Sequence, residues 1–188
     1  MARRVYFAFH YDDIFRVNVV RNSWRMHPSR DSSGYFDASL WEKAKRESDL
    51  SLKRLINKGL ENTSVTVFLL GSETAGRRWV NYELVKSVER GNGLLAVRIH
   101  QIKKPTWIRG TQIGLPGSAG QNILDQYRLQ SAYGLQSSLL SNSFSTQDWV
   151  AGNGYANLGR WVEDAASKAK SAYRGRSLVT SAGRVPLI

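Results

Sequence analysis

Short apolar runs recur along the first hundred residues of the chain. They cover residues 4–10, 65–70 and 93–100, and polar residues hardly interrupt them. Runs of this length without alternation are typical of strands that are buried on both faces of a sheet. The pattern therefore predicts at least three parallel strands, and a further short strand or a loop is expected at 34–39.

The segments between these runs repeat apolar side chains at helical spacing. Helices are expected at 12–24, 47–58 and 78–90. A later stripe predicts one more helix near the C-terminus and consists of Tyr155, Leu158, Val162, Ala165 and Ala169. Helices that alternate with buried parallel strands predict a doubly wound α/β sheet, which binds ligands at the carboxyl ends of its strands.

The regular pattern fails after residue 100. Residues 103–122 hold four glycines and two prolines, so a long loop is expected over about 103–145. We expect one domain over 1–171 and a basic tail over 172–188 that is weakly ordered or separately docked. Five basic residues and no acidic residue follow Asp164.

Composition excludes several kinds of chemistry. The chain has no cysteine, so disulfides, thiolate metal sites and cysteine catalysis are excluded. Its three histidines are far apart without metal-ligand spacing, and we expect no metal site. No segment is apolar and long enough to span a bilayer, so a cytoplasmic protein without a membrane partner is expected. The net charge of +12 invites a nucleic-acid partner, but its concentration in the tail favours a solvated surface.

The helix expected at 78–90 carries an isolated carboxylate. Glu83 lies one turn after Trp79 on the same face, beside the apolar stripe formed by Val80, Leu84 and Val88. Glu83 is therefore expected at the border of the core. Two interpretations follow from the spacing: a surface ion pair with Lys86, or a functional carboxylate near the edge of the sheet.

Other polar candidates follow the expected strands. Phe9 and His10 end the first strand, and His10 is placed to donate a hydrogen bond to a phosphate or a hydroxyl. Asp37 and Ser39 fall in a loop beside the same edge, where ordinary turn chemistry is the alternative. The sequence contains neither a GxGxxG or GxxxxGK[ST] phosphate loop nor a GxSxG nucleophile motif.

Taken in order, these segments resemble the TIR domain superfamily. The stretch "VYFAFHYDD" is similar to its first strand, "YFDASLW" to the start of its flexible second loop, and "SVTVFLLGSETAGRRWVNYEL" to its third strand and third helix. "FDASLWEKAK" and "DWVAGNGYANLGRWV" resemble, more closely, the TIR-like proteins of the bacterial Thoeris anti-phage system. The likeness is dense over 3–101 and returns over 147–162. It implies a flavodoxin-like, three-layer α/β/α fold.

The resemblance also implies an activity, the cleavage of the nicotinamide–ribose bond of NAD. The glutamate of the family motif W-x-x-x-E-[LI] falls on Glu83, which is expected to be catalytic. The residues expected to bind substrate are Phe9, His10, Asp37, Ser39 and Trp79. NAD is the substrate and no cofactor is expected. A Thoeris protein is expected to make a cyclic ADP-ribose isomer that activates a separate effector.

Two other classes of function remain open at this stage. One is a non-catalytic TIR scaffold that acts through oligomerisation, and the other is a polyanion binder. For the enzyme, a homo-oligomer is expected on activation: the loop that begins at Asp37 would leave Glu83 in water in an isolated monomer, and assembly would close it over the site.

Overall fold

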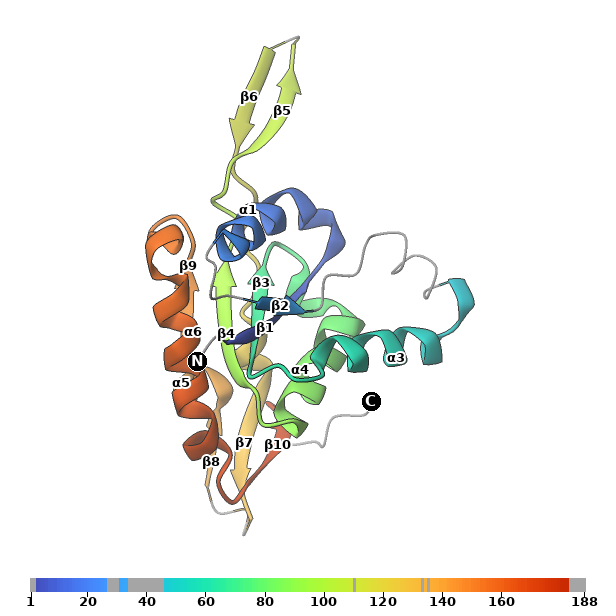
Figure 1. Cartoon of the computed structure of the whole chain (residues 1–188), viewed down its shortest axis with the longest axis vertical. Coiled ribbons are helices and arrows are strands. Elements are labelled where there is room, and N and C mark those ends of the chain that lie inside the picture. The colour runs from blue at the N-terminus through green and yellow to red at the C-terminus, as the bar shows by residue number, and fades with distance from the viewer. Residues whose placement is uncertain are drawn as a thin grey trace.

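The central sheet consists of five parallel strands in the order β2-β1-β3-β4-β9 (Figure 1). The computed structural model describes residues 3–26, the backbone of 31–33, residues 46–109, 111–132, 134 and 136–182. The strands are β1 (Arg4–Phe9), β2 (Asp31–Ser33), β3 (Val65–Leu70), β4 (Gly93–Arg98) and β9 (Thr146–Asp148). This order is that of a flavodoxin-like sheet, which confirms the predicted fold class.

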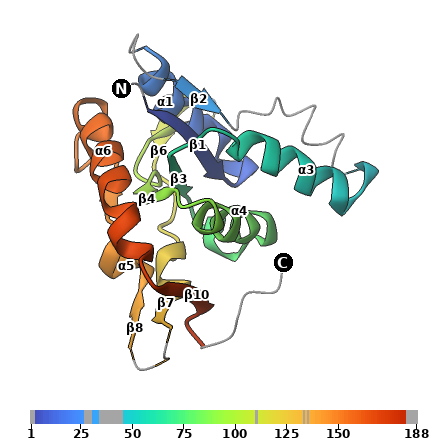
Figure 2. The same cartoon turned by 60° about the horizontal axis from the view of Figure 1, so that its bottom comes forward.

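Helices cover both faces of this sheet and give three layers (Figures 1 and 2). The main helices are α1 (Ile14–Arg25), α3 (Asp49–Leu60), α4 (Arg78–Glu89) and α6 (Gly154–Tyr173). Buried residues of α1 and α6 join one apolar cluster, and those of α3 and α4 join another. Because side chains alternate along a strand, Val5 and Phe7 belong to the first cluster, whereas Tyr6 and Ala8 belong to the second.

The strands expected at 4–10, 65–70 and 93–100 and the helices expected at 12–24, 47–58 and 78–90 are present, with small differences at their ends. The short strand or loop expected at 34–39 lies outside the described residues. Every residue of β3 is buried, as its unbroken apolar run predicts. Helix α3 begins at Asp49, because the side chain of Ser48 accepts a hydrogen bond from the backbone N–H of Ser51 at 3.1 Å. In α6 the predicted stripe is buried except for Tyr155, which is 60% exposed.

The prediction of a long loop over about 103–145 is wrong for most of its length. The segment contains β5 (Lys104–Ile108), β6 (Thr111–Leu115), β7 (Tyr127–Ser131), β8 (Ser137–Leu139) and the short helix α5 (Leu140–Ser143). Strands β5 and β6 form a hairpin that projects from the body (Figure 1). Nearly every residue of this hairpin is exposed, so the sequence shows no alternation that would reveal it.

The C-terminal segment also differs from the expected tail. Helix α6 continues through the boundary expected at residue 172, and β10 (Arg176–Thr180) pairs antiparallel with β7. Together β10, β7 and β8 form a second, three-stranded sheet. Of the two alternatives for the tail, the structure thus supports a docked segment over 176–180. Residues 183–188 lie outside the described part of the chain.

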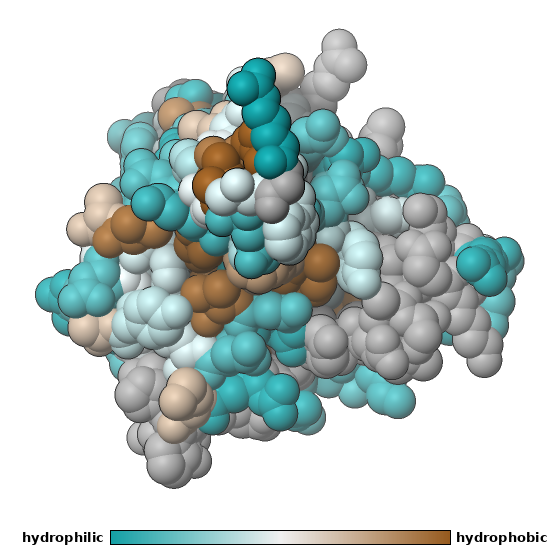
Figure 3. All heavy atoms as spheres, turned by 90° about the horizontal axis from the view of Figure 1, so that it is seen from above, coloured by the Kyte–Doolittle hydropathy of each residue, from teal (hydrophilic) through white to brown (hydrophobic). Residues whose placement is uncertain are grey.

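The surface around the hairpin is mixed in character. Seen from above in Figure 3, apolar patches lie around the projecting hairpin and are separated by hydrophilic residues. The aromatic side chain of the hairpin, Trp107, is 70% exposed. Among the described residues, no helix combines the length and the apolar character needed to cross a membrane.

Candidate functional site

The carboxyl ends of β1 and β3 meet at one edge of the sheet. The carboxylate of Asp13, which follows β1, lies so close to Gly71, which follows β3, that a Cβ atom at Gly71 would overlap it. Asp13 is 8% exposed and accepts a hydrogen bond from Arg16 at 3.3 Å. Burial raises the pKa of Asp13, and the charge of Arg16 opposes that rise. The absence of a side chain at Gly71 therefore leaves room for the buried carboxylate of Asp13.

Helix α4 starts directly after this edge. No side chain caps its N-terminus, but the side-chain amide of Asn81 donates to the backbone carbonyls of Ala75 and Arg77, both at 2.9 Å. These bonds fix the first turn of α4 to the turn before it. Val80 and Leu84, which belong to the expected apolar stripe, are buried against the sheet.

Glu83 lies deeper than its position on the helix predicts. It is 4% exposed, so the expectation of a carboxylate at the border of the core is wrong. The hydroxyl of Tyr6 donates a hydrogen bond of 2.5 Å to Oε1 of Glu83. Among the residues that the structure describes, Oε2 is buried without a hydrogen-bond partner. The carboxyl group therefore has one fixed oxygen and one unsatisfied oxygen in an apolar setting.

Burial dominates the electrostatics of this carboxyl group. Loss of water raises the pKa of Glu83 to about 8, and the hydrogen bond from Tyr6 opposes that rise. Burial, followed by the neighbouring Glu83, raises the pKa of Tyr6 well above its usual range, so the phenol remains protonated. The alternative of a surface ion pair with Lys86 is not found, because Lys86 pairs with Glu89 at 2.7 Å. Glu83 is also shielded from water in a single chain. The loop from Asp37, whose opening was expected to hydrate it, lies outside the described residues up to residue 45.

Trp79 lies on the same side of the sheet as Glu83. It is partly buried against the apolar cluster that contains Tyr6 and Leu84. Its ring meets Tyr82 edge-on at 5.8 Å between centroids, and the guanidinium of Arg78 lies over it, 4.8 Å from its centroid. Trp79 thus offers a fixed aromatic surface one turn before Glu83.

Phe9 is not brought together with these residues. Its side chain packs against the cluster of α1 and α6, on the opposite face of the sheet from Glu83. The alternation of side chains along β1 explains this, since Phe9 is an odd number of residues from Tyr6. Asp37 and Ser39 lie outside the described residues.

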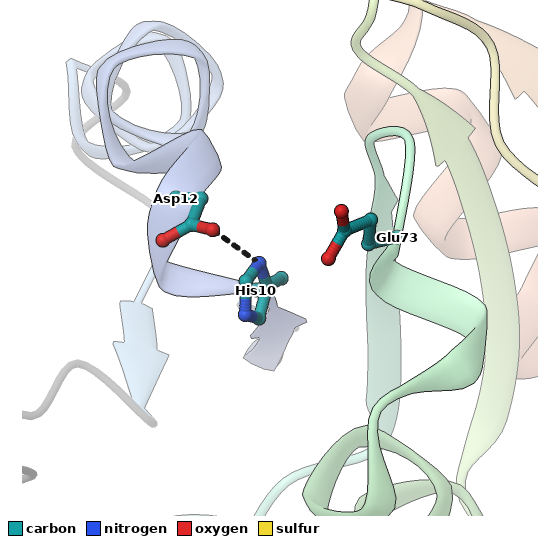
Figure 4. A group of neighbouring side chains, drawn as sticks. All are labelled: His10, Asp12 and Glu73. Atoms are coloured by element: carbon teal, nitrogen blue, oxygen red, sulfur yellow. Dashed lines mark ion pairs between the residues drawn. The ribbon is translucent and has the colours of Figure 1, made fainter.

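His10 lies at the edge of the sheet in a group that the sequence did not indicate. Its Nδ1 is 3.6 Å from Oδ2 of Asp12, and ligand atoms of His10, Asp12 and Glu73 lie within 4.8 Å of one another (Figure 4). This spacing suits a shared metal ion, although we expected no metal site from the separation of the histidines. Sequence spacing could not reveal the group, because Glu73 follows β3 whereas the other two follow β1. Glu73 already forms an ion pair with Arg77, and both acids are exposed, so the group is equally an ordinary surface cluster.

A shallow hollow lies beside this group, with a volume of about 440 Å³. Its lining residues come from the turn after β3 and from the segment before β7: Ser72, Glu73, Ala75, Gly76, Arg77 and Gln121. The hollow is open to solvent, and its lining is mixed in polarity. Tyr6 lies in β1 and His10 directly follows that strand, four residues later, which corresponds to roughly 13 Å of extended chain. The carboxyl of Glu83 is buried and does not line this hollow, so the hollow and the buried pair are separate features of the fold.

Tyr6 is the site residue that the sequence interpretation missed. One signal was available: a tyrosine in the middle of an apolar run must find a partner for its hydroxyl once buried. The pattern could not say which residue that partner is, because the pair joins β1 to α4.

The strand order and the buried glutamate on the helix after β3 are those of a TIR-type α/β domain. The family described as Thoeris protein ThsB, TIR-like domain, matches residues 6–104 of this chain. A protein of Bacillus cereus (strain MSX-D12), named "Putative cyclic ADP-D-ribose synthase ThsB1", is 40% identical over 198 residues, which cover 86% of this chain and 100% of that protein. The chain therefore belongs to the Thoeris ThsB family of TIR-like proteins, which confirms the resemblance seen in the sequence.

Proposed function

We propose that this protein cleaves the nicotinamide–ribose bond of NAD and makes a cyclic ADP-ribose isomer as a signal in anti-phage defence. Membership of the ThsB family and the name of its Bacillus cereus relative support this activity. The observation that carries the proposal is the buried carboxyl of Glu83, with one oxygen fixed by Tyr6 and the other unsatisfied.

A single carboxylate suffices for this reaction. The leaving nicotinamide is already a cationic pyridinium, so no general acid has to protonate it. The ribose that remains develops positive charge at its anomeric carbon, as in other glycoside cleavages. An ionised Glu83 in a site that excludes water stabilises that charge far more than the same group would in solution.

The raised pKa of Glu83 fits this role only if the substrate changes its ionisation. Without substrate the carboxyl is neutral below about pH 8. A pyridinium ring placed near it favours the charged form, because an opposite charge lowers the pKa of a carboxyl group. Substrate binding would thus generate the carboxylate that the reaction needs.

The remaining expected residues receive separate roles. Trp79 is proposed to form an apolar wall against the nicotinamide or its ribose. His10 is proposed to hydrogen-bond farther along the dinucleotide at the edge of the sheet. Because Asp12 and Glu73 lie beside it, the second ribose suits this position better than the diphosphate. Asp37 and Ser39 remain proposals for substrate binding, whereas Phe9 is dropped because its side chain packs on the opposite face of the sheet. No metal or cofactor is part of this proposal.

The identity of the nucleophile decides the product. Water would give linear ADP-ribose, whereas a hydroxyl of the same molecule's adenosine would give a cyclic isomer that is lighter by one water. The diffusible cyclic product would then activate a separate effector. We further propose that a homo-oligomer is the active form, because a carboxyl that is 4% exposed needs a movement to admit substrate.

Incubation with NAD and chromatography of the products test the proposal. Glu83→Gln keeps the size of the side chain and removes its charge, so turnover should fall ~10²-fold or more. Glu89→Gln is the matched control: Glu89 lies on the same helix, is exposed and pairs with Lys86. Wild-type turnover in Glu83→Gln would reject the mechanism. The absence of any nicotinamide release, with NAD left intact under activating conditions, would favour the scaffold alternative.

A further inference from the structure

Tyr6 and Glu83 form an isolated polar pair inside the apolar cluster between the sheet and α4. Tyr6 is 1% exposed and Glu83 is 4% exposed. Their bond, at 2.5 Å between the hydroxyl and Oε1, is at the short end of the range for O–H···O contacts. The hydroxyl of Tyr6 and Oε1 of Glu83 are each other's hydrogen-bond partner, which both need because they are buried.

No other charged group acts on this carboxyl among the described residues. Two charged side chains of α4 pair elsewhere: Lys86 with Glu89, and Arg78 with Asp49 of α3 at 2.6 Å. Lys53 of α3 lies over the ring of Tyr82, 5.6 Å from its centroid. The ionisation of Glu83 is therefore governed by the loss of water and by the hydroxyl of Tyr6.

We propose that Tyr6 is a positioning residue for Glu83, which holds Oε1 so that Oε2 is the oxygen presented to the ribose of the substrate. This inference rests on the catalytic role proposed above for Glu83. The hydroxyl is rigid in direction because Tyr6 belongs to β1, which is paired on both sides with β2 and β3. A donor on a central strand fixes the carboxyl more tightly than a donor on a loop would.

The bond also sets how readily the carboxyl ionises. A hydrogen bond donated to a carboxylate stabilises the charged form, whereas the apolar surroundings disfavour it. Tyr6→Phe removes the donor and keeps the ring, so ionisation of Glu83 should require a higher pH. Hydrogen bonds to charged groups are strong enough to shift the ionisation constant ~10-fold or more.

Two measurements on Tyr6→Phe test the proposal. The first is an NMR titration of the Glu83 carboxyl carbon, which needs no activity and should show a rise of about one pH unit or more. The second is the pH profile of kcat for NAD cleavage. Turnover at pH 7 should fall ~10-fold, the rising limb should move to higher pH, and the loss should shrink once both proteins are ionised.

Tyr127→Phe is the matched control. Tyr127 belongs to the same apolar cluster and its hydroxyl also donates to α4, to Oδ1 of Asn81 at 2.8 Å. It does not contact Glu83, so a general loosening of α4 would appear in this variant, whereas the pH shift would not. If Tyr6→Phe does not fold, difluorotyrosine at position 6 replaces it. This more acidic phenol is a stronger donor and should move the Glu83 titration to lower pH.

An unchanged Glu83 titration in Tyr6→Phe, or an equal shift in Tyr127→Phe, would overturn the positioning role. A shifted titration with full activity in Glu83→Gln would instead reject the proposed function and leave the pair as a structural feature. The two failures are thus distinguishable.

Discussion

The carboxyl of Glu83 binds a proton in the folded chain at pH values where an unfolded chain has released it. Its ordinary pKa of 4.5 is raised to about 8 by burial. Between these values the folded state binds more protons than the unfolded state, so the free energy of unfolding falls as pH rises. The contribution of Glu83 to stability is fully present below about pH 4.5 and is lost as pH rises through about 8.

Glu83→Gln removes this dependence, because glutamine does not titrate. We expect the Tm of the wild type to fall relative to that of Glu83→Gln as pH rises from 5 to 8. The difference in free energy grows by up to about 1.4 kcal/mol per pH unit. Thermal denaturation at four pH values measures it, with Glu89→Gln expected to follow the wild type. Parallel curves for wild type and Glu83→Gln would contradict the raised pKa.

Gly93 provides a second prediction for a single residue. A Cβ atom at this position, the first of β4, would overlap the backbone carbonyl of Ala165 on α6. Backbone cannot move aside as a flexible side chain can, so Gly93→Ala should lower the free energy of unfolding by about 2 kcal/mol or more. Gly76→Ala is the control, since no atom lies within 4 Å of its added Cβ. Urea denaturation of both variants measures the difference, and equal stabilities would refute the close packing of β4 and α6.

At the scale of elements, burial decides which segments the sequence revealed. β3 is buried along its whole length and α4 buries one stripe, so each leaves a clear apolar pattern. The β5–β6 hairpin is exposed on both faces and leaves none. β10 is short and half exposed, and it is stabilised by pairing with β7, a partner far away in the sequence.

Because β10 pairs with β7, removal of the C-terminal residues that include β10 should destabilise the fold. Val179 is 5% exposed and Leu178 packs against the cluster that contains Leu129 of β7. A chain that ends at Tyr173 should therefore lose about 2 kcal/mol or more of unfolding free energy, the value of burying one large aliphatic side chain. A chain that ends at Ala182 keeps β10 and should match the full length. Chemical denaturation measures the free energy of unfolding of the two shortened chains. Equal values would mean that residues 176–180 are dispensable for stability.

At the scale of the whole molecule, access to Glu83 links the fold to activation. In a single chain the carboxyl is shielded from water and therefore from substrate as well. If assembly provides the movement that admits NAD, turnover per protomer should rise with protein concentration. The measurement is NAD cleavage over a wide concentration range, with the mass of the protein followed in parallel. Constant, high turnover down to a proven monomer would reject the requirement for assembly.

The sequence by itself determined the layered α/β architecture, the place of Glu83 on the helix after β3, and the family. These features follow from local patterns: apolar runs, helical spacing and a contiguous motif. Only the tertiary structure decided that Glu83 is buried, that Tyr6 holds it, that Phe9 faces the other side of the sheet, and that His10 lies beside Glu73. Each of these depends on strands and helices from distant parts of the chain meeting in space, and the ionisation of a carboxyl group responds to the water and donors around it rather than to its neighbours in sequence.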